Sequence, residues 1–363
     1  MQMIQIMDNF NIKGSIIHAQ EYGNGHINKT YLVRTTENER FILQQINTSI
    51  FKKPKEVMEN IELVTMHIRK KCVKNGHKDC SRLALEIVST KDKKNYIKSR
   101  DSYWRLYRFI EGAKTYETIE NPNHFYEAGK AVGLFQKQLA DFPIKKLNIT
   151  IPDFHDTPKR YDKFVDIANK DEFNRGLDIF NEIKFIFDRK KDMALIMDGI
   201  KARKIPIRVT HNDTKLNNIM FDEKTDEAIC IIDLDTVMPG SVLFDFGDAI
   251  RIGASTAEED EKDLSKVKLD LNLFRKFTEG FLEILKNDLK KEEINLLVDS
   301  AKIITLECGM RFLTDYLAGD KYFKINYEEH NLDRARTQIK LVQEIEEKYS
   351  QMQEIVHSII NKK

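Results

Sequence analysis

The chain has few cysteines, no long apolar run and almost no net charge, and each absence excludes a class of protein. Its four cysteines, Cys72, Cys80, Cys230 and Cys308, include no C-x-x-C pair. We therefore expect neither a zinc site nor a disulfide framework. Cys230 lies inside an apolar segment and is expected in the core.

Long apolar segments are missing as well. No stretch approaches the length of a membrane-spanning helix. The N-terminal segment MQMIQIMDNFNIKG is not followed by the uninterrupted apolar run of a secretory signal. We therefore expect a cytoplasmic protein with no membrane partner.

The chain also lacks an excess of charge of either sign. Its 59 Lys and Arg residues nearly balance its 58 Asp and Glu residues, and the formal net charge is +1. Binding to nucleic acid phosphates demands a basic excess, so we expect no nucleic-acid partner. The basic run 69–78 is expected to be a solvated helix end and turn. Nothing in the sequence indicates an oligomeric state.

The length of the chain and its patterning predict two lobes. A chain of 363 residues exceeds the size that one core comfortably serves. Strand patterns dominate before residue 112, at 15–21, 30–35, 40–46, 84–89 and 102–110, with one amphipathic helix at about 55–71. Helical patterns dominate afterwards, at 125–140 and around 161–202, 268–287, 291–318 and 333–361. We expect an α+β fold with a small β-rich N-terminal lobe, 1–111, and a larger, mainly helical C-terminal lobe, 112–363.

The segment 210–221, THNDTKLNNIMF, carries a carboxylate, a cation and an amide at fixed spacing. Asp213 precedes Lys215 by two positions and Asn218 by five. These offsets match the catalytic loop of protein kinases, in which the Asp accepts a hydroxyl proton and the Asn holds a metal ion. We therefore expect Asp213 to be a catalytic base and Lys215 a phosphate contact.

A second carboxylate follows this loop at a distance that suits a metal site. Asp233, in the segment IIDLD, comes twenty residues after Asp213. Between them, 219–221 and 228–232 are typical of short strands joined by the polar turn 222–227. A hairpin of that size would return Asp233 beside Asn218. Because Mg²⁺ is usually held by a few protein oxygens together with water and phosphate, we expect Asn218 and Asp233 to bind Mg²⁺.

A glycine-containing segment, GNGHINKT, lies between two predicted strands. Its glycines and short polar side chains can cradle an anion. Taken alone it indicates an Asn-Gly hairpin turn, but beside a kinase-like catalytic loop it is where nucleotide phosphates would be covered. The candidate contacts are Gly23, Asn24, Gly25, His26, Asn28 and Thr30.

Two further segments of the small lobe bear on nucleotide binding. Phe109, Ile110 and Glu111, at the lobe boundary, are candidates to contact an adenine edge, although a plain connecting strand is equally consistent with the pattern. Kinases place a Lys on the third strand, whereas FILQQIN has Gln44 there. Glutamine donates hydrogen bonds without charge. We therefore expect Gln44 to assist phosphate binding while magnesium and Lys215 supply more of the charge.

Several sequence blocks together resemble a known family. HNDTKLNN, IDLDTVMPG, LFDFGDAIR, GNGHINKTYLV, FILQQIN and LECGMRFLTDYLAGDKYFK resemble the aminoglycoside phosphotransferase and choline kinase superfamily over nearly the whole chain. More narrowly, they resemble the N-acetylhexosamine 1-kinases. The resemblance implies a protein-kinase-like bilobal fold and ATP-dependent phosphorylation of the anomeric hydroxyl of GlcNAc or GalNAc.

Carried onto matching positions, the resemblance again makes Asp213 the base and Asn218 and Asp233 the magnesium ligands. It places Lys215 near the transferred phosphate or the sugar. It also implies that Asp245 is a buried residue that braces the backbone of the catalytic loop.

The C-terminal block supplies the expected sugar contacts, Arg311 and Tyr322. For Arg311 an alternative is visible in the sequence. Glu307, Arg311 and Asp315 are spaced four residues apart, so they could form exposed ion pairs along one helix.

Two other functions stay open. One is a kinase of the same fold for another small acceptor, such as choline or another amino alcohol, homoserine or an aminoglycoside. The acidic run 258–263 could line such a cleft, although we expect a solvated loop there. The other is an inactive nucleotide-binding module, which the intact Asp213, Asn218 and Asp233 argue against.

Overall fold

The computed structural model describes residues 2–23, 27–76 and 80–362. The chain divides into two compact units. The first consists of Met1–Lys114, Gln138–Pro152 and Met220–Pro239, and the second of Thr115–Lys137, Asp153–Ile219 and Gly240–Lys363.

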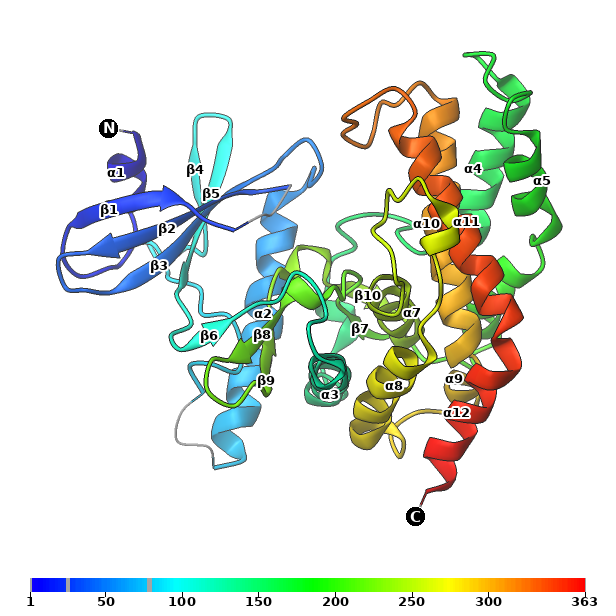
Figure 1. Cartoon of the computed structure of the whole chain (residues 1–363). Coiled ribbons are helices and arrows are strands. Elements are labelled where there is room, and N and C mark those ends of the chain that lie inside the picture. The colour runs from blue at the N-terminus through cyan, green and yellow to red at the C-terminus, as the bar shows by residue number, and fades with distance from the viewer. Residues whose placement is uncertain (1, 24–26, 77–79, 363) are drawn as a thin grey trace. The chain divides into compact units, whose positions relative to one another are not determined.

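The first unit is built on an antiparallel sheet of order β1-β2-β3-β5-β4 (Figure 1). Its strands are β1 (Ile16–Glu21), β2 (Lys29–Thr35), β3 (Arg40–Ile46), β4 (Ile97–Ser99) and β5 (Ser102–Arg108). Alternate residues of the strands, including Val33, Phe41, Leu43 and Leu106, are buried beside side chains of the short N-terminal helix α1 (Gln2–Met7). The predicted strands 15–21, 30–35, 40–46 and 102–110 are confirmed to within two residues at each end.

Helix α2 (Pro54–Lys74) is the long helix of the first unit. A proline opens it, where the missing backbone donor costs nothing. Val57, Ile61, Val64 and Ile68 are buried, as their helical spacing predicts.

A hairpin completes the first unit. β8 (Ile219–Asp222) and β9 (Ala228–Ile231) are joined by the predicted polar turn, in which the backbone N–H of Asp222 donates to the carbonyl of Glu227 at 2.9 Å. The two-residue strand β6 (Ala113–Lys114) pairs with β8. Cys230 is buried in this hairpin, as expected.

The predicted strand 84–89 is wrong. Ile87 makes only an isolated bridge with Tyr107, and the N–H of Val88 donates to Leu106 at 2.8 Å. Another segment, β4, occupies the far end of the same edge of β5, pairing Ile97 with Trp104. Two short segments thus share one edge, so neither forms a long strand there.

The sequence was expected to carry no disulfide framework, but one pair of its cysteines does form a disulfide. Cys72, in the last turns of α2, forms a disulfide with Cys80, and their Cα atoms are 6.0 Å apart. Gly76 has a φ of +80°, which permits the chain to reverse after the helix. Two cysteines eight positions apart can therefore meet without the C-x-x-C pattern.

Helices make up most of the second unit (Figure 1). They are α3 (Pro122–Gln138), α4 (Thr157–Lys170), α5 (Phe180–Asp188), α6 (Leu195–Lys201), α7 (Val242–Gly253), α8 (Leu271–Leu285), α9 (Lys291–Asn295), α10 (Leu297–Leu317), α11 (His330–Glu347) and α12 (Tyr349–Asn361), with the short strand β7 (Arg208–Thr210). The short strand β10 (Met238–Gly240) includes the point in the sequence where the first unit ends and the second resumes. The long pattern 161–202 is broken, because Asp171 ends α4 in the left-handed conformation. None of the helices in the described part is long and apolar enough to cross a membrane.

Helix α7 was not predicted from the sequence. It is buried on almost every side, from Val242 to Arg251. A helix with no exposed face lacks the amphipathic period that identifies helices in sequence. Gly247 permits its close approach to α10, since a β-carbon there would lie 2.5 Å from the carbonyl oxygen of Ser300. The mixed architecture, a β-sheet region followed by a larger helical part, confirms the predicted fold class.

Candidate functional site

The predicted catalytic loop follows β7 and is closed by a 3₁₀ turn at Leu216–Asn218. Asp213 lies at its centre. Lys215 Nζ donates to its Oδ1 atom at 3.0 Å, and Asn218 Nδ2 donates to its Oδ2 atom at 3.1 Å and to its backbone carbonyl at 2.8 Å. The three residues predicted from their spacing are therefore in mutual contact.

Electrostatics keep Asp213 ionised. Burial alone would raise the pKa of its carboxyl group, but Lys215 and His211 more than offset this effect, so the pKa of Asp213 is lowered. The same ion pair raises the pKa of Lys215. The loop therefore presents a carboxylate with an ammonium beside it.

Asp245 braces the loop from α7, as the resemblance implies. Its carboxylate accepts the backbone N–H of Asn212 at 2.7 Å and that of His211 at 3.1 Å. Gln136 of α3 donates to the same carboxylate at 2.8 Å. Burial raises the pKa of Asp245. Asp245 thus fixes two backbone N–H groups of the loop that carries Asp213, and Gln136 holds the carboxylate in place.

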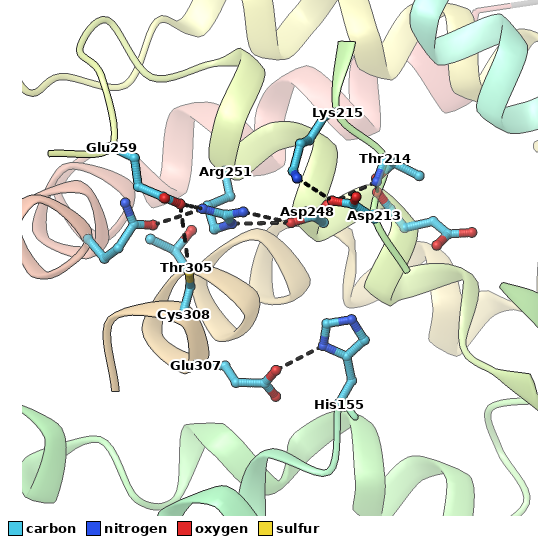
Figure 2. A network of polar contacts seen from close by, with 12 residues as sticks. His155, Asp213, Thr214, Lys215, Asp248, Arg251, Glu259, Thr305, Glu307 and Cys308 are labelled. Atoms are coloured by element: carbon cyan, nitrogen blue, oxygen red, sulfur yellow. Dashed lines mark hydrogen bonds and ion pairs between the residues drawn. The ribbon is translucent and has the colours of Figure 1, made fainter. Parts of the chain in front are cut away.

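A second brace, missed from the sequence, comes from Asp248 one turn further along α7. It accepts the N–H of Thr214 at 2.9 Å and two hydrogen bonds from Arg251, at 3.2 and 3.0 Å. Arg251 also pairs with Glu259 at 2.8 Å (Figure 2). Residues three apart on a helix share a face, which is the only sequence signal for the Asp248–Arg251 pair.

The acidic run 258–263 is more structured than a solvated loop. Besides the pair between Glu259 and Arg251, Asp260 lies 2.9 Å from the imidazole Nε2 of His330. The hydroxyl of Thr337 donates to the carbonyl of Glu261 at 3.0 Å. These contacts hold the run against α11.

The alternative for Arg311, a row of exposed ion pairs with Glu307 and Asp315 along α10, is wrong. Glu307 is buried and accepts from His155 Nδ1 at 2.8 Å (Figure 2). It also accepts from the Thr157 hydroxyl at 2.6 Å. Burial acts to raise the pKa of Glu307, but His155 and Arg160 outweigh it and lower the pKa to about 2. Burial thus directs Glu307 inward instead of towards its helical neighbour.

Asp315, the other member of that row, also points inward. It accepts the backbone N–H groups of Lys321, Tyr322 and Phe323 at 2.8 to 3.0 Å. It therefore fixes the segment that carries Tyr322, whose own side chain is 64% exposed.

Arg311 is left without a carboxylate. Its guanidinium lies 5.7 Å from the ring centroid of Phe154 and 5.5 Å from that of Phe323. Among the described residues it makes no ion pair and no hydrogen bond. A half-buried cation whose five donors are unused is suited to contact a ligand rich in oxygen.

Asp233 lies in the first unit, at the end of the hairpin. Its backbone is left-handed, with φ and ψ both 57°, and it opens a 3₁₀ turn at Leu234–Thr236. Asp235, two residues later, is buried and pairs with Arg105 of β5. Sequence reasoning gave neither Arg105 nor Asp235 a role.

The predicted nucleotide contacts of the small lobe fall in three groups. Asn24, Gly25 and His26 lie outside the described residues. Gly23 has a φ of +77° and open space where a side chain would be, which suits a close backbone approach. Thr30, Gln44 and Asn28 bond to other side chains of the first unit.

At the boundary segment, Arg40 joins Phe109 to Glu111. Arg40 Nε donates to the Glu111 carboxylate at 2.9 Å, and its guanidinium lies 4.0 Å from the Phe109 ring centroid. Ile110 is buried. An adenine contact here stays a prediction.

The donor chemistry fits a magnesium ion, although the described residues contain no cluster of three or more His, Cys, Asp or Glu side chains that could hold a metal. The amide nitrogen of Asn218 is committed to Asp213, which leaves its carbonyl oxygen as the atom that can coordinate a cation. Asp233, in the first unit, carries a carboxylate, and its sharing of a metal ion with Asn218 stays a prediction. Mg²⁺ is usually coordinated by a few protein oxygens, and water and phosphate oxygens complete its coordination.

Solved structures with the same fold support the kinase-like architecture. They include an aminoglycoside phosphotransferase from Alicyclobacillus acidocaldarius, with a TM-score of 0.63 and 11% identity over 98% of this chain and 96% of that one. A microcompartment-associated aminopropanol kinase has a TM-score of 0.61 and 13% identity over 97% and 98%. A choline kinase from Cryptosporidium parvum has a TM-score of 0.61 and 15% identity over 99% of both chains.

Sequence identities this low establish only that the folds are the same. The family is established by a match of the sequence itself. Residues 18–265, well over half of the chain, match the profile described as the phosphotransferase enzyme family. The match includes the catalytic loop, Asp233 and the braces on α7. The chain therefore belongs to the phosphotransferase enzyme family.

Proposed function

We propose that the protein transfers the γ-phosphoryl group of ATP to the anomeric hydroxyl of an N-acetylhexosamine, GlcNAc or GalNAc. The observation that carries phosphoryl transfer is the carboxylate of Asp213, held between Lys215 and Asn218 in a loop braced by two further aspartates. In this chemistry the protein mainly positions and stabilises charge.

Asp213 is the proposed base. Its lowered pKa keeps it ionised, and an ionised carboxylate accepts the hydrogen bond of the acceptor hydroxyl and then its proton. An anomeric hydroxyl is more acidic than an ordinary alcohol, so an aspartate with a low pKa suffices. Lys215 then stabilises negative charge at the transferred group, a role that matters more because Gln44 lacks charge.

Asn218 and Asp233 are the proposed magnesium ligands. When bound, the ion neutralises charge on the nucleotide phosphates. Gly23 and its neighbours to Thr30 are proposed to cover the phosphates, and the segment from Phe109 to Glu111 to contact the adenine. These assignments give the lobe 1–111 to the nucleotide and 112–363 to catalysis and the acceptor.

The charges of the second unit favour a neutral acceptor over an amine. Arg311 and Arg160 both lie near the ring of Phe154, at 5.7 and 5.8 Å from its centroid. Glu307 and Glu259 are engaged by His155 and Arg251. A cationic amino alcohol or aminoglycoside would meet guanidinium groups here, whereas the oxygens of a sugar can accept hydrogen bonds from Arg311.

An amino alcohol is the second candidate, because structures of this fold include an aminopropanol kinase and a choline kinase. ADP release in the presence of ATP and Mg²⁺ separates the two. The panel consists of GlcNAc, GalNAc, glucose, galactose, choline, ethanolamine, homoserine and kanamycin. We expect turnover with the N-acetylhexosamines, and turnover with the amines alone would reject the sugar proposal.

A further inference from the structure

Arg105 is a buried arginine in the middle of strand β5, and it has no role in the proposed mechanism. It is 1% exposed. Burying a guanidinium is costly unless its donors find partners. Here Nε donates to Gln44 Oε1 at 2.9 Å, Nη2 donates to Asp235 Oδ2 at 3.0 Å, and Nη1 bonds to Asp235 Oδ1.

The register of the sheet explains this arrangement. Thr30 of β2 is opposite Gln44 of β3, and Gln44 is opposite Arg105 of β5. Directly opposed residues project from the same face of a sheet. Gln44 Nε2 donates to the Thr30 hydroxyl at 3.0 Å, so three strands form one polar row that ends at the guanidinium.

Asp235 connects this row to the turn that follows β9. It is 3% exposed and also accepts from Asn28 Nδ2 at 2.6 Å. It belongs to the 3₁₀ turn opened by Asp233. Asn60 of α2 donates to the carbonyl of Val237, just beyond the turn, at 2.9 Å. Sheet and helix thus hold the turn at two points.

We propose that Arg105 is a positioning residue that fixes the turn carrying Asp233 and thereby sets the affinity of the nucleotide complex for magnesium. The inference rests on the proposed function, because it takes Asp233 as a magnesium ligand. A non-glycine residue in the left-handed region is disfavoured and persists only where its surroundings hold it. The two-pronged bond between Arg105 and Asp235 supplies that support.

The pair of Arg105 and Asp235 also bears on the lysine that protein kinases have on the third strand and that this chain lacks. In protein kinases that lysine pairs with a glutamate of the neighbouring helix. Here Gln44 takes its place, while Glu59 and Glu62 of α2 bond to asparagine side chains. The buried cation of this sheet is therefore Arg105, on the strand next to that of Gln44. Its carboxylate partner is Asp235, in the turn that carries Asp233, and not a glutamate of α2.

Arg105→Lys is the most direct test, because lysine keeps the positive charge but cannot bond to both carboxylate oxygens of Asp235 as the guanidinium does. Arg108→Lys is the matched control. Arg108 lies on the same strand, is 42% exposed, and pairs with Glu39 and Glu86 rather than with the turn. Binding of ADP to the full chain is measured by calorimetry with EDTA and then with increasing MgCl₂, and melting curves confirm folding.

In Arg105→Lys we expect unchanged affinity for metal-free ADP but a loss of about tenfold or more in the enhancement of binding by Mg²⁺, as is usual when the support of a metal ligand is removed. Arg108→Lys should match the wild type. An unchanged Mg²⁺ enhancement in folded Arg105→Lys would overturn the inference alone. A wild-type protein whose ADP affinity ignores Mg²⁺ would instead reject the proposed function.

Gln44 was expected to assist phosphate binding, but its amide nitrogen donates to Thr30 and its amide oxygen accepts from Arg105, so we assign it to the support of Arg105 instead. Gln44→Met therefore gives a milder test if Arg105→Lys does not fold. It removes the bond to Nε and leaves the ion pair intact. We expect a smaller loss of Mg²⁺ enhancement with unchanged affinity for metal-free ADP. Equal weakening with and without Mg²⁺ would mean that Gln44 contacts the phosphates itself, and the positioning role would be rejected.

Discussion

Lys215 lies 3.0 Å from the carboxylate of Asp213, two residues earlier in the same loop. The pair lowers the pKa of Asp213 against the opposing effect of burial. It also holds an ammonium next to the proposed site of proton transfer. Both consequences can be tested by removing either partner.

Asp213→Asn should lower kcat by at least about 100-fold, the usual range for loss of a general base. The affinity for ADP should be nearly unchanged, because the asparagine keeps the shape of the side chain. Steady-state kinetics and calorimetry measure the two quantities. Asp188→Asn, at an exposed helix end, serves as the control, and wild-type rates in Asp213→Asn would mean that another group is the base.

Lys215→Met should lower kcat by about 100-fold, because a preorganised donor to the developing charge is lost. It should also change the pH profile. Since Lys215 lowers the pKa of Asp213, its removal raises that pKa, and the acidic limb of kcat/KM moves to higher pH. Lys215→Arg should keep the acidic limb near its wild-type position. An acidic limb that does not move in Lys215→Met would contradict the account.

Asp245→Asn should destabilise the fold by about 2 kcal/mol, because an amide nitrogen would face backbone donors that now bond to a carboxylate. The donors are the N–H groups of His211 and Asn212. kcat should fall as well, since the loop carrying Asp213 loses its brace. Urea denaturation and kinetics provide the measurements, and unchanged stability would argue against a bracing role.

The catalytic loop could be predicted from the sequence because its contacts are local. Asp213, Lys215 and Asn218 lie within six consecutive residues, so spacing alone limits how they can meet. Most strands and the buried faces of α2 and α3 were predictable for the same reason, because their apolar residues recur at regular spacing within short segments of the sequence. Helix α7 was not, because uniform burial erases the period.

Contacts between distant residues could not be read in this way. Arg105 and Asp235 are 130 positions apart, and a single sequence contains no signal that joins them. For Glu307 the local signal was misleading. Its helical spacing favoured Arg311, but burial made His155 and Thr157 its partners.

Glu307 predicts a specific dependence of stability on pH. Its pKa falls from the ordinary 4.5 to about 2 on folding. Its stabilisation is therefore complete above about pH 4.5 and is lost as the pH falls towards 2, with a total of about 3 kcal/mol. Glu307→Gln should be less stable than the wild type at pH 7, and the difference should shrink below pH 4.5. Urea midpoints between pH 7 and pH 3 measure this, with Glu347→Gln as an exposed control; a difference independent of pH would contradict the assignment.

Arg311→Leu should raise the KM for the sugar by about tenfold or more, because the hydroxyls it binds would be left unpaired. The KM for ATP should stay the same. Arg336→Leu, at a partly exposed site where the native arginine pairs with Glu182, is the control. An unchanged sugar KM in Arg311→Leu would remove Arg311 from the acceptor site.

The most direct test of the central claim is to identify the product formed from ATP and GlcNAc or GalNAc by ³¹P NMR. The account predicts a phosphate whose phosphorus couples to the anomeric proton, formed by the wild type and at least about 100-fold more slowly by Asp213→Asn. Phosphate on any other hydroxyl, or the same product from Asp213→Asn at wild-type rate, would contradict it.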